Sequence, residues 1–325
     1  MEILTQFEIP FTLFLQSLGS WLEYPMQAFT FLGNELFFLL VMPAIYWAID
    51  PQIGFRTGMM LILSGGINSF FKFLFHSPRP FWVDERVTAY SSETGFGLPS
   101  GHSQNSAAIW GIIAASLKKK WATIVIALLV FFIGISRIYL GVHFLRDVLS
   151  GWLIGVLLVV IYMKLETPVS SWLQKKTLIY QVLLGFLLSL LLIGLGLLGQ
   201  TTSRTFSVPP AWIQTAVSSG ADAPDPYNIE GVITIAGVAL GFTAGYAWYR
   251  ARFGTYTVKC ASSKRILRYV IGLVGIVVLY FGLKLVFPEE PFILGMILRY
   301  IRYALIGFWV TALAPLAFRA LHLDR

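Results

Sequence analysis

The stretch KFLFHSPRP, residues 72–80, ends a long apolar run with a lysine and places an arginine between two prolines. Two further polar blocks follow at the ends of apolar segments: PSGH at residues 99–102 and SRIYLGVHFLRD at residues 136–147. Ionisable residues near membrane depth are costly, so in an apolar chain they mark candidate functional sites. Together the three blocks supply cations, histidines and a carboxylate. Such a set can bind a phosphate, attack it and protonate its leaving group.

The composition is that of an integral helical membrane protein. Of the 325 residues, 57% are hydrophobic and 12% are charged, whereas a soluble domain of this size carries about 25% charged residues. The single cysteine, Cys260, excludes an internal disulfide and a cysteine-based metal site. Because the net charge of +8 is concentrated between apolar segments, we expect membrane lipids and no nucleic acid as partners.

A spanning helix needs about 20 mostly apolar residues. We therefore predict an all-α fold, a polytopic membrane helix bundle with a six-helix core and about three extra C-terminal transmembrane helices. The nine apolar windows are 31–49, 53–75, 101–117, 121–141, 147–164, 179–199, 230–250, 268–287 and about 293–318.

The chain is expected to divide into four parts. Residues 1–30 form an N-terminal interfacial segment, with a helix over 8–22, and residues 31–199 form the core that holds every polar block. The Pro-, Ser- and Ala-rich stretch 200–229 is an extracytoplasmic loop, and residues 230–325 form a three-helix appendage.

Lysines and arginines predict the orientation, because they concentrate on the cytoplasmic side of a membrane. If the nine windows alternate, every basic cluster falls on one side. The N-terminus and the three polar blocks then lie outside, and the C-terminus lies in the cytoplasm, in a chain whose short loops suggest a bacterial inner membrane. The clusters are Lys118–Lys120, Lys164 with Lys175 and Lys176, residues 250–268, and Arg319 with Arg325.

Three cations are candidate phosphate ligands. Lys72 and Arg137 end apolar segments, and Arg79 lies in a proline-bounded turn that limits its loss of conformational entropy. A guanidinium group matches two phosphate oxygens, whereas lysine offers a point charge. Alone, Lys72 or Arg137 would more often extend to the head groups, but the neighbouring histidines favour phosphate binding.

The PSGH block is typical of a helix start. Ser100 is a strong N-cap residue, and Gly101 allows close approach of a ligand to the backbone. The free amides at such a helix end bind anions. A capped helix alone is common, but His102 in the first turn adds a group that can transfer protons.

In the third block, Gly141 can end the preceding helix, and His143 and Asp147 lie four residues apart on one helical face. A carboxylate on one imidazole nitrogen fixes the tautomer and leaves the other nitrogen free to attack. The alternative is a structural pair at a helix start. Arg146 points elsewhere and is a candidate head-group contact.

In order and spacing, Lys72-x6-Arg79-Pro80, residues 99–102 and Ser136-Arg137-x5-His143-x3-Asp147 resemble the signature of the type-2 phosphatidic acid phosphatase superfamily, which includes lipid phosphate phosphatases and vanadium haloperoxidases. The blocks cover residues 72–147, and the last three predicted helices carry no motif.

The resemblance implies a role for each residue. His143 would be the nucleophile that forms a phosphohistidine, Asp147 would orient it, and His102 would protonate the leaving oxygen and then activate water. The phosphoryl oxygens would be bound by Lys72, Arg79, Ser100, Gly101 and Arg137. No metal and no cofactor are implied.

The expected function is hydrolysis of a lipid phosphate monoester or diphosphate at the extracytoplasmic face. Candidate substrates are phosphatidic acid, phosphatidylglycerol phosphate, a polyprenyl diphosphate and a sphingoid phosphate. A first alternative is a phosphatase for a soluble ester, similar to glucose-6-phosphatase, which also has a Glu-Thr-Gly run before its PSGH block, as in residues 93–95. A second is a binding or transport protein without turnover. A vanadate-dependent peroxidase is disfavoured because its relatives are soluble.

Several other residues are expected to have lesser roles. The loop between the first two blocks could shape substrate choice through Trp82, Asp84, Glu93 and Phe96, although aromatic residues at an interface are usually anchors. His76 and His322 are expected to be incidental. Arg299 and Arg302 either extend to the head groups or lie in an interfacial helix that precedes a later start of the ninth span. As a minority interpretation, they help to bind a lipid phosphate.

Overall fold

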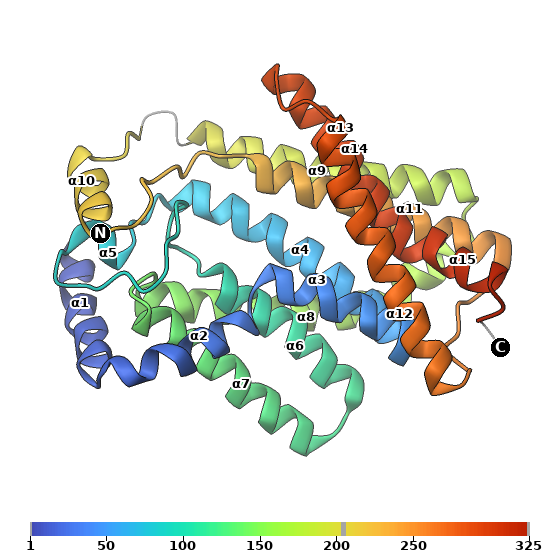
Figure 1. Ribbon diagram of the computed structural model, residues 1–325, viewed down its shortest axis with the longest axis horizontal. Helices are drawn as coiled ribbons and strands as arrows, with labels where there is room; N and C mark the ends of the chain where they lie inside the picture. Colours follow the sequence, from blue (N-terminus) through green and yellow to red (C-terminus); the bar gives the residue numbers. More distant parts are fainter. Residues whose placement is uncertain (1, 203–205, 324–325) are drawn as a thin grey trace. The chain divides into compact units, whose positions relative to one another are not determined.

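The computed structural model describes residues 2–202 and 206–323, and within this part every regular element is a helix (Figure 1). The predicted all-α class is confirmed. Arg325, which the sequence assigns to the last basic cluster, and residues 203–205 of the predicted loop lie outside the described residues.

The chain divides into two compact units. The first comprises residues 1–38, 67–160 and 195–228, and the second comprises residues 39–66, 161–194 and 229–325. Four of the five boundaries between these ranges fall inside helices, namely α3 (Glu35–Ala44), α4 (Pro51–Phe75), α8 (Leu145–Leu173) and α9 (Leu178–Thr202).

The helices of the N-terminal two thirds of the chain include all three polar blocks at or near their ends. They are α1 (Glu2–Ser17), the short helix η1 (Ser20–Leu22), α2 (Glu23–Phe31), α3 (Glu35–Ala44), the π-helical turn η2 (Ile45–Ile49), α4 (Pro51–Phe75), α5 (Pro80–Val83), α6 (Gly101–Leu117), α7 (Lys120–Tyr139), α8 (Leu145–Leu173), α9 (Leu178–Thr202) and α10 (Pro210–Ser218).

The C-terminal third consists of three long helical stretches, two of which contain a π-helical turn. Its elements are α11 (Glu230–Phe253), α12 (Ser262–Val277), η3 (Val278–Gly282), α13 (Leu283–Val286), α14 (Phe292–Phe308), η4 (Trp309–Leu313) and α15 (Ala314–Ala320).

Seven helical stretches of the described chain are long and apolar enough to cross a membrane, or eight if one bent pair counts as a single span. That pair joins Ser20–Phe31 to Glu35–Ile49 at 47° and contains most of the predicted window 31–49. The window 101–117 forms α6, which has 17 residues and a polar first turn, so it is short for a span. These two segments account for the difference from nine.

Each unit has its own apolar core. In the first unit the core gathers buried side chains around the segments next to the polar blocks, among them Phe81, Trp82, Tyr139 and Phe144. In the second unit α11 packs closely against α14, because Gly237 and Gly241 bring the two backbones together. An added Cβ at Gly241 would lie 1.8 Å from the carbonyl oxygen of Ala304.

Candidate active site

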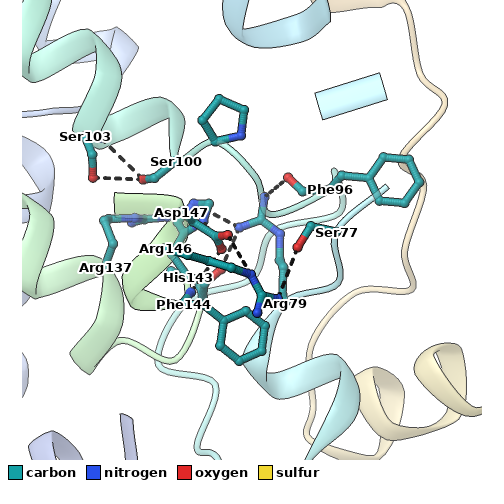
Figure 2. Close-up of polar contacts among 12 residues, drawn as sticks. Ser77, Arg79, Phe96, Ser100, Ser103, Arg137, His143, Phe144, Arg146 and Asp147 are labelled. Atoms are coloured by element: carbon teal, nitrogen blue, oxygen red, sulfur yellow. Dashed lines mark hydrogen bonds and ion pairs between the residues drawn. The ribbon is translucent and has the colours of Figure 1, made fainter. Parts of the chain in front are cut away.

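The turn before α5 positions Arg79, whose side chain is fully buried. Three backbone carbonyls accept from its guanidinium group: Gly95 from Nε at 2.6 Å, Val142 from Nη1 at 2.9 Å, and Phe96 from Nη2 at 3.3 Å. Because these carbonyls come from two separate segments, the planar donor group fixes the first block against the third. Figure 2 shows Arg79 reaching toward His143 and Asp147.

His143 and Asp147 contact one another at the start of α8. The imidazole Nδ1 lies 3.3 Å from Asp147 Oδ2, which also accepts the backbone N–H of Phe144 at 3.0 Å. Gly141 turns the chain between α7 and this pair with a φ of 77°, a conformation that glycine adopts without strain. The carboxylate is thus held on the Nδ1 side of the ring.

The other imidazole nitrogen faces a cation. His143 Nε2 lies 3.2 Å from Arg79 Nη1. Arginine can only donate, so this geometry assigns Nε2 as the acceptor and places the proton on Nδ1, facing Asp147. Burial, with the charges of Arg79 and Arg137, lowers the pKa of His143 well below its ordinary value. The ring is therefore neutral, with its Nε2 lone pair directed at Arg79.

Ser100 caps α6 and joins the second block to the third. Its hydroxyl accepts from the backbone N–H of Ser103 at 3.4 Å and from the Ser103 hydroxyl at 3.0 Å. Its own backbone N–H donates to the carbonyl of Asp147 at 2.9 Å. Gly101 follows with little space around it, since an added Cβ would lie 3.2 Å from Asn68 Oδ1. The start of α6 is thus fixed to the start of α8.

Arg137, in the last turn of α7, is buried and faces Glu93. It donates to Thr30 Oγ1 at 2.6 Å and forms an ion pair with Glu93. The second oxygen of Glu93 lies 3.6 Å from Arg79 Nη2, so one carboxylate links two of the predicted phosphate ligands. Burial alone would raise the pKa of Glu93, but the charges of Arg79 and Arg137 outweigh it and hold this pKa well below its ordinary value.

Lys72 and His102 both lie near Glu93. Lys72 is in the last turn of α4 and His102 in the first turn of α6, and the charges of both act on Glu93. Within residues 2–202 and 206–323, neither side chain has a hydrogen bond to the protein. Both are half-buried, so each can reach a ligand. In the same part of the chain, no three His, Cys, Asp or Glu side chains are grouped to hold a metal ion.

The structure therefore brings all eight predicted site residues into one region of the first unit, whereas their chemical roles stay predictions. Glu93 is the residue whose part the sequence analysis underestimated. Its signal was the Glu-Thr-Gly run at residues 93–95, but a carboxylate in an irregular loop has no periodicity that would indicate its partners.

The interpretation of Arg146 as a head-group contact is wrong. Arg146 Nη1 lies 2.5 Å from Glu8 Oε2 of α1, and its backbone N–H donates to Glu8 Oε1 at 2.7 Å. Its Nε also lies 3.9 Å from Asp147 Oδ1. An ion pair within the protein thus replaces the lipid contact, and it adds a second cation beside Asp147.

The aromatic residues of the loop before the PSGH block are core residues and not interfacial anchors. Trp82 and Phe96 are fully buried. Phe96 packs edge-on against Phe206, which also stacks on His76 with ring centroids 4.9 Å apart. The expectation of anchoring fails because residues 206–228 cover this loop.

Residues 206–228 also fix the segment that contains Glu93. Ser92 Oγ donates to Asp222 Oδ2 at 2.9 Å and accepts the backbone N–H of Asp222 at 3.0 Å. The backbone N–H of Asp225 donates to the carbonyl of Thr94 at 3.0 Å. The residues on either side of Glu93 are therefore held by the stretch that precedes α11.

Comparison with known proteins agrees with this arrangement of blocks. Residues 54–169 match the PAP2 superfamily, and residues 233–325 match the transmembrane extension of PAP2 superfamily phosphatases. Phosphatidylglycerophosphatase B of Bacillus subtilis (strain 168) is 30% identical over 167 residues, which are 48% of this chain and 80% of that protein. The chain belongs to the PAP2 superfamily. The helices that are long and apolar enough to cross a membrane make it an integral membrane member.

Two mammalian relatives differ in how much of the chain they share. Human glucose-6-phosphatase 3 is 30% identical over 169 residues, 44% of this PAP2 chain, and the chain spans about half, 49%, of that relative's length. Rat sphingosine-1-phosphate phosphatase 1 is 26% identical over 314 residues, which are 89% of this chain and 70% of that protein. The second similarity thus extends beyond the three blocks into the C-terminal helices.

Proposed function

We propose that this chain is a membrane phosphatase that hydrolyses a phosphate monoester or diphosphate of a lipid through a phosphohistidine intermediate, without a metal ion. One observation carries the proposal. His143 has its Nδ1 on the Asp147 carboxylate at 3.3 Å and its Nε2 beside Arg79 at 3.2 Å. A protein that only binds phosphate has no need of an oriented nucleophile.

The reaction divides into two displacements. In the first, the lone pair of His143 Nε2 forms a bond to phosphorus while the bond from phosphorus to the ester oxygen breaks, and His102 gives a proton to that oxygen. Burial and the charge of Arg137 lower the pKa of His102 to about 3, so His102 carries this proton only when the bound phosphate adds negative charge beside the ring. Asp147 stabilises the positive charge that develops on the ring. In the second, His102 takes a proton from water, the water oxygen attacks phosphorus, and the bond to Nε2 breaks. The products are inorganic phosphate and the leaving group, which is an alcohol from a monoester and a lipid monophosphate from a diphosphate.

The cations stabilise charge that develops on the phosphoryl oxygens. Arg79 and Arg137 each have a planar guanidinium group that matches two phosphoryl oxygens, and Lys72 adds a point charge. Because protein groups already engage these guanidinium donors, a phosphoryl group has to displace or share some of those partners. The hydroxyl of Ser100 and the amide of Gly101, at the start of α6, add neutral donors to the same group. Fixed cations in a site with little water supply the electrostatic stabilisation that such a transition state needs.

We further propose that the site opens on the extracytoplasmic face of a bacterial plasma membrane and that the C-terminus is cytoplasmic. Lys118–Lys120 lie at the opposite end of α6 from Ser100, which supports this orientation if α6 crosses the membrane. An impermeant maleimide tests it in intact cells. The sole cysteine, Cys260, should remain unlabelled, whereas Glu85→Cys in a Cys260→Ser background should react. The opposite pattern would reverse the orientation.

The experiment that tests the activity combines a substrate panel with detection of the intermediate. Purified wild-type protein, given a ³²P-labelled lipid phosphate and quenched rapidly, should yield acid-labile phosphoprotein. His143→Ala should yield none and should lose turnover, whereas His322→Ala, which alters an exposed histidine outside the site, should behave as wild type. Full hydrolysis by His143→Ala would overturn the mechanism, and absence of phosphoprotein in the wild type would favour a binding protein.

A soluble phosphate ester is the second candidate substrate. The Glu93-Thr94-Gly95 run places Glu93 on Arg79 and Arg137, and the relative of that activity, glucose-6-phosphatase 3, is 30% identical. The ratio of kcat/KM values for lipid phosphates and sugar phosphates separates the two. Candidate lipids are phosphatidic acid, phosphatidylglycerol phosphate, a polyprenyl diphosphate and a sphingoid phosphate.

A further inference from the structure

A second polar pocket lies in the C-terminal helices, which the proposed reaction does not use. It is a cavity of about 150 Å³ between the start of α11, the segment before α14 and the first turns of α14. Its walls include Glu230, Glu289, Glu290, Phe292, Arg299 and Arg302. None of these residues belongs to the site around His143.

Arg302 is a buried cation that has no carboxylate oxygen within 4.0 Å among the described residues. The residue is 7% exposed, and its Nε has no hydrogen-bond partner among residues 2–202 and 206–323. The rings of Tyr280 and Tyr303 lie 5.5 Å and 5.3 Å from its Cζ. Aromatic faces attract a cation, but Nε of the guanidinium group is left without an acceptor.

The neighbouring arginine on α14, unlike Arg302, is paired with a carboxylate. Arg299, one turn earlier on α14, forms an ion pair with Glu230 of α11. Burying an uncompensated charge costs several kcal/mol, so Arg302 calls for an anion. Since it lines the cavity, a ligand in the cavity can provide one.

The position of the cavity indicates where that anion comes from. Phe292 begins both α14 and the apolar stretch Phe292–Ala320, which is long enough to cross a membrane. The stretch has 29 residues, whereas a span needs about 20, so its first two or three turns can lie outside the hydrocarbon core. Arg302, ten residues after Phe292, then lies near the depth of lipid phosphates.

The remaining charges of the pocket are acidic. Glu230 is engaged by Arg299, but Glu289 and Glu290 are exposed at the edge of the cavity. Two carboxylates would repel a purely anionic ligand and would attract an ammonium group. The set of charges thus matches a ligand that has a phosphate and an amine close together.

We propose that this pocket binds the head group of an aminophospholipid, with its phosphate on Arg302 and its ammonium beside Glu289 and Glu290. The bound lipid supplies the counterion that Arg302 lacks. The site is a binding site on the transmembrane extension, and its occupancy does not depend on hydrolysis at His143.

The test measures binding of short-chain lipids to the purified full chain in detergent, by native mass spectrometry and by the shift in thermal unfolding. The probes are dihexanoyl phosphatidylethanolamine, dihexanoyl phosphatidylglycerol, dihexanoylglycerol and inorganic phosphate. We expect the ethanolamine lipid to bind most tightly and dihexanoylglycerol not to bind. Arg302→Gln should weaken the ethanolamine lipid about tenfold or more, the effect of losing a charge-assisted contact.

Matched variants make the result specific. Lys284→Gln removes an exposed cation from α13 and should leave binding unchanged. The double variant Glu289→Gln, Glu290→Gln should weaken the ethanolamine lipid but not the glycerol lipid. If Arg302→Gln does not fold, Arg302→Lys replaces it, and this variant should also bind more weakly because it loses the planar pair of donors.

Three outcomes would overturn the proposal. The ethanolamine lipid binds the folded Arg302 variant as tightly as it binds the wild type, dihexanoylglycerol binds as tightly as the ethanolamine lipid, or inorganic phosphate is the only probe that binds. His143→Ala separates this site from the proposed activity. That variant should bind the ethanolamine lipid normally, so the two proposals can fail independently.

Discussion

Arg137 and Glu93 form an ion pair in the interior of the first unit, and the other oxygen of Glu93 lies 3.6 Å from Arg79. A carboxylate of this chain thus occupies donors that the proposed mechanism assigns to the phosphoryl group. A substrate has to share these donors with Glu93 or displace it. Binding and chemistry at this site are therefore linked through one acidic side chain.

Replacing Glu93 with glutamine should tighten phosphate binding. The variant keeps the shape of the side chain but removes the charge that competes for Arg79 and Arg137, so we expect the inhibition constant of inorganic phosphate to fall about 3- to 10-fold, the size of one charge-assisted contact. Steady-state inhibition measures this constant. Glu85→Gln, at an exposed position of the same loop, is the control and should have no effect. An unchanged or higher inhibition constant for Glu93→Gln would contradict competition.

Formation of the phosphoenzyme should not decline near pH 6.5 on the acid side. The pKa of His143 lies well below the ordinary value of about 6.5, because of burial and the nearby charges of Arg79 and Arg137. Since the folded pKa is lowered, the neutral ring persists as the pH falls through the range in which an exposed histidine is protonated. Rapid-quench rates between pH 5.5 and 8 measure this. The prediction fails if the rate of phosphoenzyme formation falls on the acid side with a midpoint near pH 6.5 while the rate of phosphoenzyme hydrolysis does not. That pattern would show that His143 titrates normally.

Replacing Asp147 with asparagine should reduce kcat with little change in KM. The amide keeps the volume, but it cannot stabilise the charged ring, and one of its orientations sets an NH₂ group against the N–H of Phe144. Loss of the carboxylate in a comparable histidine pair costs about 10⁴-fold in kcat. Asp84→Asn, in the loop after α5, should retain activity. A variant within tenfold of wild type would mean that the pair is only structural.

An alanine at Gly151 should impair catalysis more than stability. Its Cβ would lie 2.8 Å from the carbonyl of Ser100 and 3.0 Å from the N–H of Gln104, so α8 and the start of α6 must move apart. We expect kcat/KM to fall about tenfold or more, because a shift near 1 Å in the catalytic groups has effects of up to 10²-fold. Gly194→Ala, where an added Cβ meets nothing within 4 Å, should be neutral or slightly stabilising. Equal activity of the two variants would show that close packing of α8 against the start of α6 does not matter for catalysis.

The sequence predicted those parts of the site that depend on local chemistry. Ser100 caps α6 and Gly141 ends the turn after α7, because capping and positive φ are properties of single residues. The pairs Glu93 with Arg137 and Glu8 with Arg146 could not be predicted. Each pair joins residues far apart in the chain, and no periodicity in the sequence indicates how the irregular segments between them are folded.

The same limit applies to the helices. Hydropathy predicted the long apolar stretches, since burial in lipid requires about 20 apolar residues whatever their neighbours are. It did not distinguish a straight span from the 47° bend between Phe31 and Glu35. Neither did it indicate the surroundings of Arg302, which depend on where the rings of Tyr280 and Tyr303 lie.

The hydrogen bonds from Asp222 and Asp225 to Ser92 and Thr94 join the approach to α11 to both sides of Glu93. The stretch before α11 thereby holds the backbone on both sides of the carboxylate that contacts Arg79 and Arg137. Changes in the sequence or length of residues 206–228 would alter how firmly Glu93 is held. The residues that the proposed mechanism assigns to the phosphoryl group would stay the same. Enzymes with identical chemical machinery could in this way diverge in their sensitivity to accumulated phosphate.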